Sequence, residues 1–259
     1  MKSALLLLTM LQTNNLVHED ECIDDLQNGG LMLIQKKNGF KFGIDAVLLS
    51  DFAKEPAAKR ALDLCTGTGI IAVLLSAKTK IPWIDALEIQ PEIYDMARRS
   101  VEYNGIGERV HISMGDLKNA AEIYGKNVFD KVTVNPPYMK AGSGIINGSD
   151  TKTISRHEVL CTLEDVISSA AAVMKTKGHF FMVHRPSRLT DIIWLMRQYK
   201  IEPKRLRFVH PSAGKAANLL LIEGVKNGGN ELKLMEPLYV YDENGRYTEE
   251  INNIYGRAE

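Results

Sequence analysis

The chain has 259 residues, of which 45% are hydrophobic, and its 32 basic residues balance its 32 acidic residues. This length and composition fit one large α/β domain, or a domain with appendages, built on a sizeable core. The balanced charge gives no indication of a partner. No run approaches the roughly 18 apolar residues of a transmembrane helix, so we expect no membrane partner.

The cysteines and the first residues bear on the cellular compartment. The cysteines are odd in number and lack a CxxC pair or a metal-ligand spacing: Cys22, Cys65 and Cys161. Reduced thiols in a cytoplasmic protein without a metal centre are therefore expected. The apolar run Leu5–Leu8 is short for a signal peptide, and residues 13–15 offer no small-x-small cleavage site. We interpret residues 1–17 as a poorly ordered N-terminal extension.

The first predicted elements precede the main repeating pattern. Leu31–Gln35 is typical of a strand. After the run Gly39–Gly43, the pattern of Asp45–Phe52 predicts a helix, with Asp45 suited to cap it.

From residue 60 onward the chain alternates between strand and helix signals, as βαβ units do. The predicted strands are Arg60–Leu64, Trp83–Ile89, Val110–Met114, Phe129–Val134 and His179–His184. The predicted helices are Ile70–Lys78, Pro91–Asn104, Leu163–Met174 and Pro186–Tyr199. This alternation predicts an α/β protein with a Rossmann-like, doubly wound, mostly parallel sheet.

The pattern changes after residue 200. Arg205–Val209 and Leu219–Val225 are strand-like, but the loop Pro211–Asn218 joins them in place of a helix. Such a gap suits an antiparallel hairpin better than a parallel crossover, which usually takes a dozen residues or more. We therefore predict a domain over residues 18–226 that ends in a hairpin. The remainder, 227–259, is expected to be an ordered tail with tyrosines available for packing: Tyr239, Tyr241, Tyr247 and Tyr255.

A glycine-rich turn separates the first strand of the alternating pattern from its helix. The run Asp63–Ala72 contains G-x-G-x-x-A, with Gly67 and Gly69 as its glycines. Glycines let the backbone approach a ligand closely, and the helix N-terminus offers free N–H groups. The strand–turn–helix setting predicts a nucleoside cofactor.

Acidic residues follow the next two strands. Glu88 lies 25 residues after Asp63 and is suited to accept both hydroxyls of a ribose, a solvent-facing acid being the alternative. Asp116 is suited to accept from an adenine amine, with a helix N-cap as the alternative. A nicotinamide dehydrogenase uses the same kind of turn and acid, so these features alone leave that class open.

The tetrapeptide Asn135-Pro136-Pro137-Tyr138 decides against a dehydrogenase. Two prolines end the preceding strand in a stiff turn. The Asn135 side-chain carbonyl and the Pro136 backbone carbonyl are suited to accept the two N–H bonds of an adenine amine, and Tyr138 is suited to stack on the base. These bonds would direct the delocalised lone pair toward an incoming methyl group. A sulfonium donor leaves as a neutral group, so positioning and electrostatics suffice and no strong general base is required.

Charge is distributed unevenly along the chain. Between Lys175 and Lys215 there are ten Lys or Arg residues and only two acidic residues. This stretch fits a nucleic-acid surface, although a solvated basic face is the alternative.

Together these motifs resemble those of class I S-adenosylmethionine-dependent methyltransferases, in the group that methylates adenine, guanine or glutamine nitrogens. Further segments are similar to the bacterial valine-tRNA adenine-N6 methyltransferases: Phe40–Leu49, Ser155–Glu158, His184–Leu189, Pro203–Pro211, Lys215–Leu219 and Tyr247–Glu250. The resemblance covers roughly Asp20–Gly256. It implies a seven-stranded sheet with an antiparallel last strand.

The resemblance also implies roles for individual residues. The catalytic set is Asn135, Pro136, Pro137 and Tyr138. The cofactor set is Lys41, Phe42, Gly43, Asp45, Asp63, Cys65, Thr66, Gly67, Gly69, Glu88, Ile89, Asp116, Leu117 and Asn135. Within it, Lys41–Asp45 belongs to an N-terminal segment, 18–55, that closes over the methionine end of the cofactor. Cys65 stands where many relatives carry glycine or another small residue.

The resemblance further implies an RNA surface. Its candidates are Arg156, His157, His184, Arg185, Arg205, Arg207, His210 and Lys215. Phosphate contacts from these residues would supply affinity and not sequence choice. A surface salt bridge is the alternative for each, and a structural role suits His157 and His184 equally well.

The expected function is S-adenosylmethionine-dependent methylation of adenosine N6 in a tRNA, next to the anticodon of valine tRNA by resemblance. An anticodon loop lets the target base unstack at little cost. A guanine-N2 rRNA methyltransferase or a glutamine-N5 protein methyltransferase would use the same tetrapeptide. A cofactor-sensing RNA-binding protein without turnover is the non-enzymatic alternative.

Overall fold

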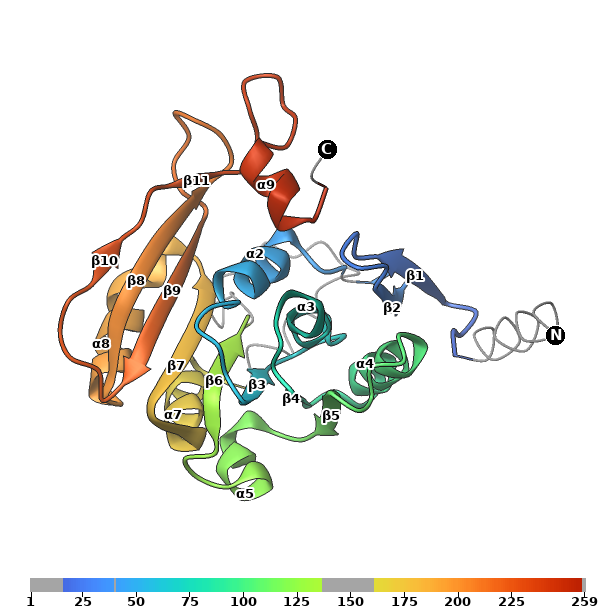
Figure 1. Cartoon of the computed structure of the whole chain (residues 1–259), viewed down its shortest axis with the longest axis horizontal. Helices are drawn as coiled ribbons and strands as arrows, with labels where there is room; N and C mark the ends of the chain where they lie inside the picture. Colours follow the sequence, from blue (N-terminus) through green and yellow to red (C-terminus); the bar gives the residue numbers. More distant parts are fainter. Residues whose placement is uncertain (1–15, 40, 137–160, 258–259) are drawn as a thin grey trace, which may run out of the picture.

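The computed structural model describes residues 16–39, 41–136 and 161–257 (Figure 1). The predicted N-terminal extension up to residue 15 lies outside the described residues. So do four of the predicted site residues: Pro137, Tyr138, Arg156 and His157.

A central sheet carries the fold, in the order β10-β8-β9-β7-β6-β3-β4-β5, with β11 also paired to β8. Its seven longer strands are β3 (Arg60–Leu64), β4 (Trp83–Glu88), β5 (Val110–Met114), β6 (Phe129–Val134), β7 (Met174–His184), β8 (Ile201–His210) and β9 (Leu219–Lys226). The short strands are β10 (Lys233–Leu234) and β11 (Leu238–Tyr239). The prediction of a mostly parallel, seven-stranded sheet is confirmed, with two short strands added at one edge.

The predicted antiparallel hairpin is also confirmed. β9 pairs antiparallel with both β7 and β8 and lies between them. Because β9 runs back from the end of β8, only a short loop is needed, whereas a parallel strand there would require a crossover.

Helices cover both faces of the sheet (Figure 1). One face carries α2 (Ile44–Phe52), α3 (Ile70–Lys78) and α4 (Pro91–Tyr103), and the other carries α5 (Ala120–Tyr124), α7 (Leu163–Val173) and α8 (Leu189–Gln198). Side chains of β7 alternate between the two cores, with Phe181 packed on the α2 side and Phe180 on the α7 side. Burial of both faces explains why the strand runs of the sequence are so apolar.

Two smaller units complete the described chain. An antiparallel pair, β1 (Glu21–Asp25) and β2 (Met32–Lys36), packs against α4. The C-terminal segment contains α9 (Glu249–Ile254), whose Ile251 joins the same core as α2. Tyr247 stacks between Tyr241 and Tyr255 in that segment.

Several local expectations are corrected by the structure. The N-cap of α2 is Gly43, so Asp45 stands inside the first turn and does not cap the helix. β7 begins at Met174, five residues before the predicted start at His179, because the expected turn is an irregularity within the strand. The helix expected from Pro186 begins as a short 3-10 turn before α8.

Candidate active site

The candidate site lies at the edge of the sheet where the parallel strands β3, β4, β5 and β6 end. Leu64 of β3 stands level with Leu87 of β4 and with Val134 of β6. The next residues along these strands, among them Glu88 and Asn135, therefore leave the sheet at one level. Glu88 and Asn135 are two strand spacings apart, about 10 Å. The chain order reverses between β3 and β6, and such a switch point is where open α/β sheets bind ligands.

The turn after β3 depends on left-handed backbone conformations. Gly67 and Gly69 have φ values of 58° and 88°, and Cys65 has φ 55°. A Cβ at Gly69 would lie in ordinary contact, 3.4 Å, with the Cβ of Ala97 on α4, so this position favours glycine for its conformation and not for space. The backbone at Cys65 explains why the resemblance places glycine or a small residue there. The Cys65 thiol also hydrogen-bonds with that of Cys161, which raises the pKa of Cys65.

The buried Asp63 side chain holds this turn in place through hydrogen bonds. Its carboxyl is fully buried and accepts hydrogen bonds from the hydroxyls of Thr66 (2.5 Å) and Thr133 (2.7 Å). Burial raises the pKa of Asp63 to about 7, the two hydroxyls oppose the shift, and the charge of Glu88 adds to it. Asp63 thus ties the turn to β6. Thr133 was missed in the sequence because only the pairing of β3 with β6 brings it there.

Glu88 braces the same turn from the next strand. It is only 4% exposed, so the alternative of a solvent-facing acid is wrong. Its Oε2 accepts the N–H of Gly67 (2.9 Å), and its Oε1 accepts the N–H of Gln90 (3.0 Å). The side-chain amide of Gln90 also donates to Oε1 at 3.3 Å, so three of the roughly four acceptor positions of this carboxylate are used and one remains for a ribose hydroxyl.

The remaining cofactor candidates follow β4 and β5. Ile89 is half-buried, whereas Leu117 is buried in the core on the α7 side. Asp116 is the N-cap of a 3-10 turn over Leu117–Asn119, and its Oδ1 accepts the N–H of Lys118 at 2.9 Å. The capping alternative for Asp116 is therefore confirmed, and a contact with adenine stays a prediction.

The segment that enters α2 is held from two sides. Gln35 of β2 is 1% exposed, accepts the N–H of Phe42 (3.0 Å) and donates to Asp24 (2.5 Å). Lys41 forms an ion pair with Asp24 at 3.2 Å. Gln35 carried no signal in the sequence, because its role depends on the fold of the N-terminal strand pair over the chain that follows.

Asn135 comes directly after β6 and meets that segment. Its Nδ2 donates to Oδ2 of Asp45, at the start of α2, at 3.3 Å. The following Pro136 is buried. A stiff, buried proline after the strand limits the backbone freedom of Asn135. The structure thus brings Asn135, Asp45, Gly67 and Glu88 to the same edge.

Three of the RNA candidates lie along the other half of this edge. Arg185 follows β7, His210 ends β8, and Lys215 lies in the loop between β8 and β9. Arg185 donates to the carbonyl of Asn218 (3.2 Å), and the His210 ring bonds the carbonyl of Lys215 (2.7 Å). Arg185 and His210 thus both contact the backbone of the loop that joins β8 to β9.

The other described candidates are either buried or paired with acidic residues of this chain. His184 is buried, which with the nearby Arg188 charge lowers its pKa to about 4, so its ring is neutral at pH 7. Arg205 pairs with Glu223 of β9, and Arg207 pairs with Glu250 of α9 at 2.7 Å. Both arginines lie within β8 and not at its end. A neutral histidine and two paired arginines are poor phosphate ligands, so among the described candidates the RNA role remains a proposal for Arg185, His210 and Lys215.

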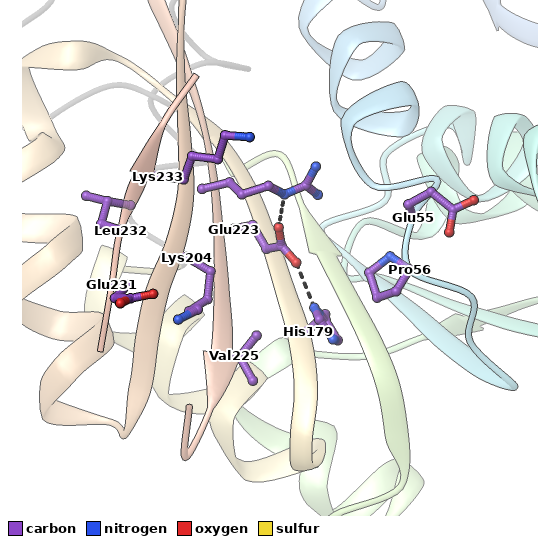
Figure 2. Close-up of a pocket in the computed structure, with 10 residues that line it drawn as sticks. Glu55, Pro56, His179, Lys204, Glu223, Val225, Glu231, Leu232 and Lys233 are labelled. Carbon is purple, nitrogen blue, oxygen red and sulfur yellow. Dashed lines mark hydrogen bonds and ion pairs between the residues drawn. The ribbon is translucent and has the colours of Figure 1, made fainter. Parts of the chain in front are cut away.

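A hollow of about 660 Å³ lies away from this edge, among β7, β8, β9 and the loop before β3 (Figure 2). At its centre Glu223 bonds His179 at 2.7 Å and also pairs with Arg205. Although burial opposes the shift, these two partners lower the pKa of Glu223. The central charges of the hollow are already paired, and none of the cofactor candidates lines it.

No helix among the described residues is long and apolar enough to cross a membrane. The same part of the chain contains one group of possible metal ligands, His18, Asp20 and Glu21. Arg99 occupies both carboxylate oxygens of Glu21 at 2.7 Å, so this group is an ion-pair network.

A switch-point turn with a buried acid on the adjacent strand defines the class of nucleoside-cofactor α/β proteins. Within that class, residues 42–193 match the methyltransferase small domain family. The chain belongs to this family: it is a methyltransferase, and S-adenosylmethionine is its cofactor.

The curated relatives include several enzymes with one printed name, tRNA1(Val) (adenine(37)-N6)-methyltransferase. The protein from Porphyromonas gingivalis W83 is 29% identical over 71% of this chain and 73% of its own length. The protein from Aeromonas hydrophila subsp. hydrophila is 25% identical over 81% of this chain and 86% of its own length.

Solved structures confirm the fold. A predicted O-methyltransferase from Agrobacterium tumefaciens has a TM-score of 0.67 and 23% identity, covering 83% of this chain and 97% of its own. The geranyl diphosphate C-methyltransferase of Streptomyces coelicolor, solved with S-adenosyl-L-homocysteine, has a TM-score of 0.52 and 12% identity, covering 70% and 76%. At these identities the likeness concerns the fold alone.

Replacing Glu88 with alanine is expected to weaken binding of S-adenosylmethionine by about 10- to 100-fold. Each hydrogen bond to a charged group contributes about 1.5–3 kcal/mol, and the turn also loses its brace at Gly67. Isothermal titration calorimetry measures the dissociation constant. Glu92→Ala, which removes an acidic residue from the first turn of α4, is the matched control and should bind like wild type. Unchanged affinity of the Glu88 variant would exclude the ribose role.

Proposed function

We propose that this methyltransferase transfers the methyl group of S-adenosylmethionine to the exocyclic N6 of an adenosine in tRNA. The observation that carries the proposal is the position of Asn135. It leaves β6 level with the cofactor turn on β3 and is followed by a buried proline. An amide held at that point offers an acceptor for a planar amine beside the methyl donor, as this reaction requires.

The relatives support tRNA adenine as the acceptor, since several share the printed name of a tRNA adenine-N6 methyltransferase. The basic groups at the ends of β7 and β8 support an RNA substrate independently. Neighbouring strands are about 4.8 Å apart, so β8 lies three spacings, about 14 Å, across the sheet from Asn135. By the strand register Asn135 is level with Arg207, and the end of β8 at His210 lies about 10 Å further along the strand. A loop whose target base enters at Asn135 would then lay flanking phosphates over Arg185 and Lys215.

In the proposed mechanism the protein positions the two reactants and polarises the adenine amine. Asn135 Oδ1 and the Pro136 carbonyl accept the two N–H bonds of the adenine amine. Glu88 and the turn at Gly67 hold the nucleoside of the cofactor. S-Adenosylmethionine supplies the methyl group and leaves as a neutral thioether, and the amine proton passes to solvent.

Transfer of labelled methyl groups from S-adenosylmethionine tests this function. Total tRNA, rRNA and release-factor protein serve as parallel acceptors, and the products are digested to nucleosides or amino acids and separated. Labelled N6-methyladenosine from tRNA is the expected product. Label only in rRNA guanine or in protein glutamine would overturn the proposal and assign the chain to one of those two substrate classes.

The double variant Arg185→Ala, Lys215→Ala is expected to weaken tRNA binding about 10-fold or more at moderate salt, without affecting cofactor binding. Loss of two phosphate contacts should also reduce the slope of log affinity against log salt by about 1.5. Filter binding over a salt series measures both quantities. Lys233→Ala removes an exposed lysine that lines the hollow away from the edge, and it should bind tRNA like wild type. Equal salt slopes for all three proteins would refute this surface.

A further inference from the structure

We infer that Asp45 is a positioning residue that sets which way the Asn135 amide faces. This inference rests on the proposed function and adds to it a role for a residue that the resemblance assigned to cofactor closure. The starting observation is the 3.3 Å hydrogen bond from Nδ2 of Asn135 to Oδ2 of Asp45.

The chemistry of the two groups makes this contact directional. A carboxylate only accepts hydrogen bonds, whereas the two ends of an amide differ: the nitrogen donates and the oxygen accepts. Rotating the Asn135 amide by half a turn would place its oxygen against an oxygen of Asp45. The carboxylate therefore selects the rotamer in which the nitrogen is committed to Asp45 and Oδ1 is turned elsewhere.

The position of Asp45 at the start of α2 suits an acidic side chain. Asp45 is in the first turn of the helix, where the helix dipole stabilises negative charge. Its Oδ1 accepts the N–H of Ala46 at 3.0 Å, and its Oδ2 accepts from Asn135. The helix backbone thus holds one oxygen of the carboxylate, and the other oxygen contacts Asn135.

The backbone before Asp45 is shaped around this side chain. A Cβ at Gly43 would lie 2.6 Å from Oδ1 of Asp45, so a side chain at that position would push the carboxylate aside. Gln35, buried in β2, holds the N–H of Phe42 one residue earlier. The glycine thus leaves space for the Asp45 carboxylate, and the buried amide of Gln35 anchors the chain that leads into α2.

The orientation matters because the substrate amine donates both of its hydrogens. Only Oδ1 of Asn135 accepts from it; a flipped amide would set one NH₂ group against another. Without Asp45 both rotamers become accessible, and the flipped one is unproductive. Removing Asp45 should therefore lower turnover while the cofactor still binds.

The test compares Asp45→Asn, Asp45→Ala and Asn135→Ala with wild type, at saturating cofactor and tRNA. Asparagine at 45 can donate as well as accept, so it no longer selects a rotamer. We expect kcat to fall about 10-fold or more in both Asp45 variants, with the dissociation constant of S-adenosylmethionine within about threefold of wild type. In the Asn135→Ala background, Asp45→Asn should have no further effect on kcat. Asp51→Asn, at the other end of α2, is the matched control and should keep its kcat.

Two outcomes overturn the inference. One is a variant whose kcat is retained while its cofactor affinity falls, which assigns Asp45 to cofactor closure. The other is a full additive loss in the double variant, because then Asp45 acts independently of Asn135. A readout without turnover is the side-chain NH₂ resonance pair of Asn135, identified by its loss in Asn135→Ala. This pair should shift in Asp45→Asn and stay in place in Asp51→Asn.

The wild-type measurement separates this inference from the proposed function. If wild type methylates no tRNA adenine, the proposed function fails, and the NMR comparison still decides whether Asp45 orients the amide. If wild type is active and the resonances of Asn135 do not respond to Asp45→Asn, the inference alone fails.

Discussion

Replacing Asn135 with alanine is expected to reduce methyl transfer to tRNA by about 10²–10³-fold or more in kcat. Groups that stabilise developing charge at a fixed position contribute on this scale when one is removed. The alanine variant keeps the strand and the backbone carbonyl of Pro136 but loses the side-chain acceptor for the amine. Binding of S-adenosylmethionine should remain close to wild type, because Glu88 and Gly67 form the turn without Asn135. Single-turnover transfer of a labelled methyl group measures the rate, and calorimetry measures the affinity.

The same strand offers a matched control. Asn127 lies in the turn before the other end of β6, where its side chain accepts from Lys226. Its φ of 57° suits glycine, so Asn127→Gly removes an asparagine side chain without backbone strain. This variant should keep its rate. An Asn135→Ala protein that methylates tRNA as fast as the Asn127→Gly control would refute the catalytic assignment.

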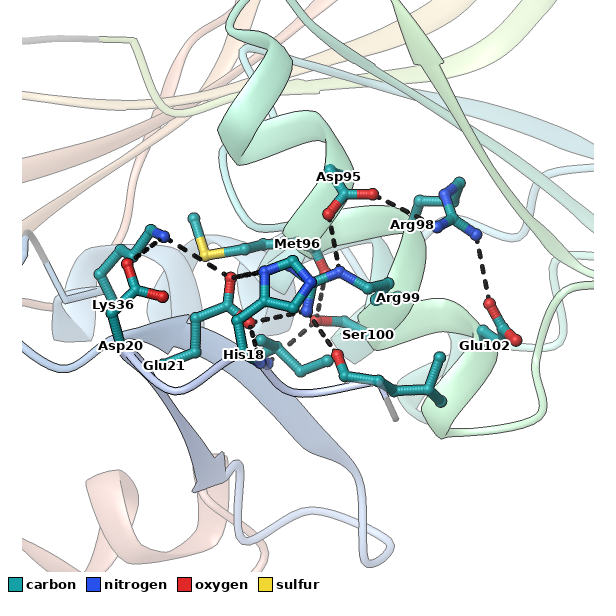
Figure 3. A network of polar contacts seen from close by, with 12 residues as sticks. His18, Asp20, Glu21, Lys36, Asp95, Met96, Arg98, Arg99, Ser100 and Glu102 are labelled. Atoms are coloured by element: carbon teal, nitrogen blue, oxygen red, sulfur yellow. Dashed lines mark hydrogen bonds and ion pairs between the residues drawn. The ribbon is translucent and has the colours of Figure 1, made fainter. Parts of the chain in front are cut away.

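The second large effect is on stability and comes from the ion pair that anchors β1 to α4 (Figure 3). Glu21 and Arg99 form two hydrogen bonds of 2.7 Å, and their side chains are 1% and 5% exposed. Arg99→Met would leave the Glu21 carboxylate buried without its main partner. Removing one member of a buried pair typically costs about 3–5 kcal/mol of unfolding free energy. Chemical denaturation monitored by circular dichroism measures this loss.

Two further variants distinguish the loss of the buried ion pair from the general effect of replacing an arginine on this helix. Arg98→Met removes the neighbouring arginine, whose contacts with Asp95 and Glu102 are exposed, and should cost at most about 1 kcal/mol. The double variant Glu21→Met, Arg99→Met removes both buried charges and should recover most of the stability. An Arg99→Met protein as stable as Arg98→Met would show that the buried pair is not needed.

The pair also predicts how stability depends on pH. Although burial opposes the shift, hydrogen bonds from Arg99 and from the N–H of His18 lower the pKa of Glu21 below 4.5. The folded state therefore binds this proton less tightly than the unfolded chain. The contribution is complete above the unfolded pKa and is lost as the pH falls through the folded one.

Where local chemistry decides the structure, the sequence predicted it well. The turn from Asp63 to Gly69 was predictable because glycines next to a strand and an apolar helix have few other conformations. The hairpin after Arg205 was predictable from loop length alone. Glu88 was placed correctly because it ends a strand that must be parallel to the one before the turn.

Where a contact with a residue distant in the sequence determines the structure, the prediction from sequence was wrong or incomplete. Asp45 was expected to cap its helix, whereas its contact with Asn135, 90 residues away, depends on the docking of α2. For Arg205 and Arg207 the sequence left RNA contact and a salt bridge open, and the structure shows acidic partners for both on β9 and α9. β1 was not predicted, because its pairing with β2 and its anchor on Arg99 carry no local signal.

The sequence by itself determined the class of this protein: a parallel sheet, a nucleoside turn with its acid, and an Asn-Pro-Pro-Tyr segment that suits methyl transfer to a planar nitrogen. These features follow from steric limits and hydrogen-bonding capacity within a few residues. Only the tertiary structure decided which charges are paired and that the amide of Asn135 contacts Asp45. The reason is physical: burial and charge pairing are properties of the folded chain, set by residues that the sheet brings together from distant positions.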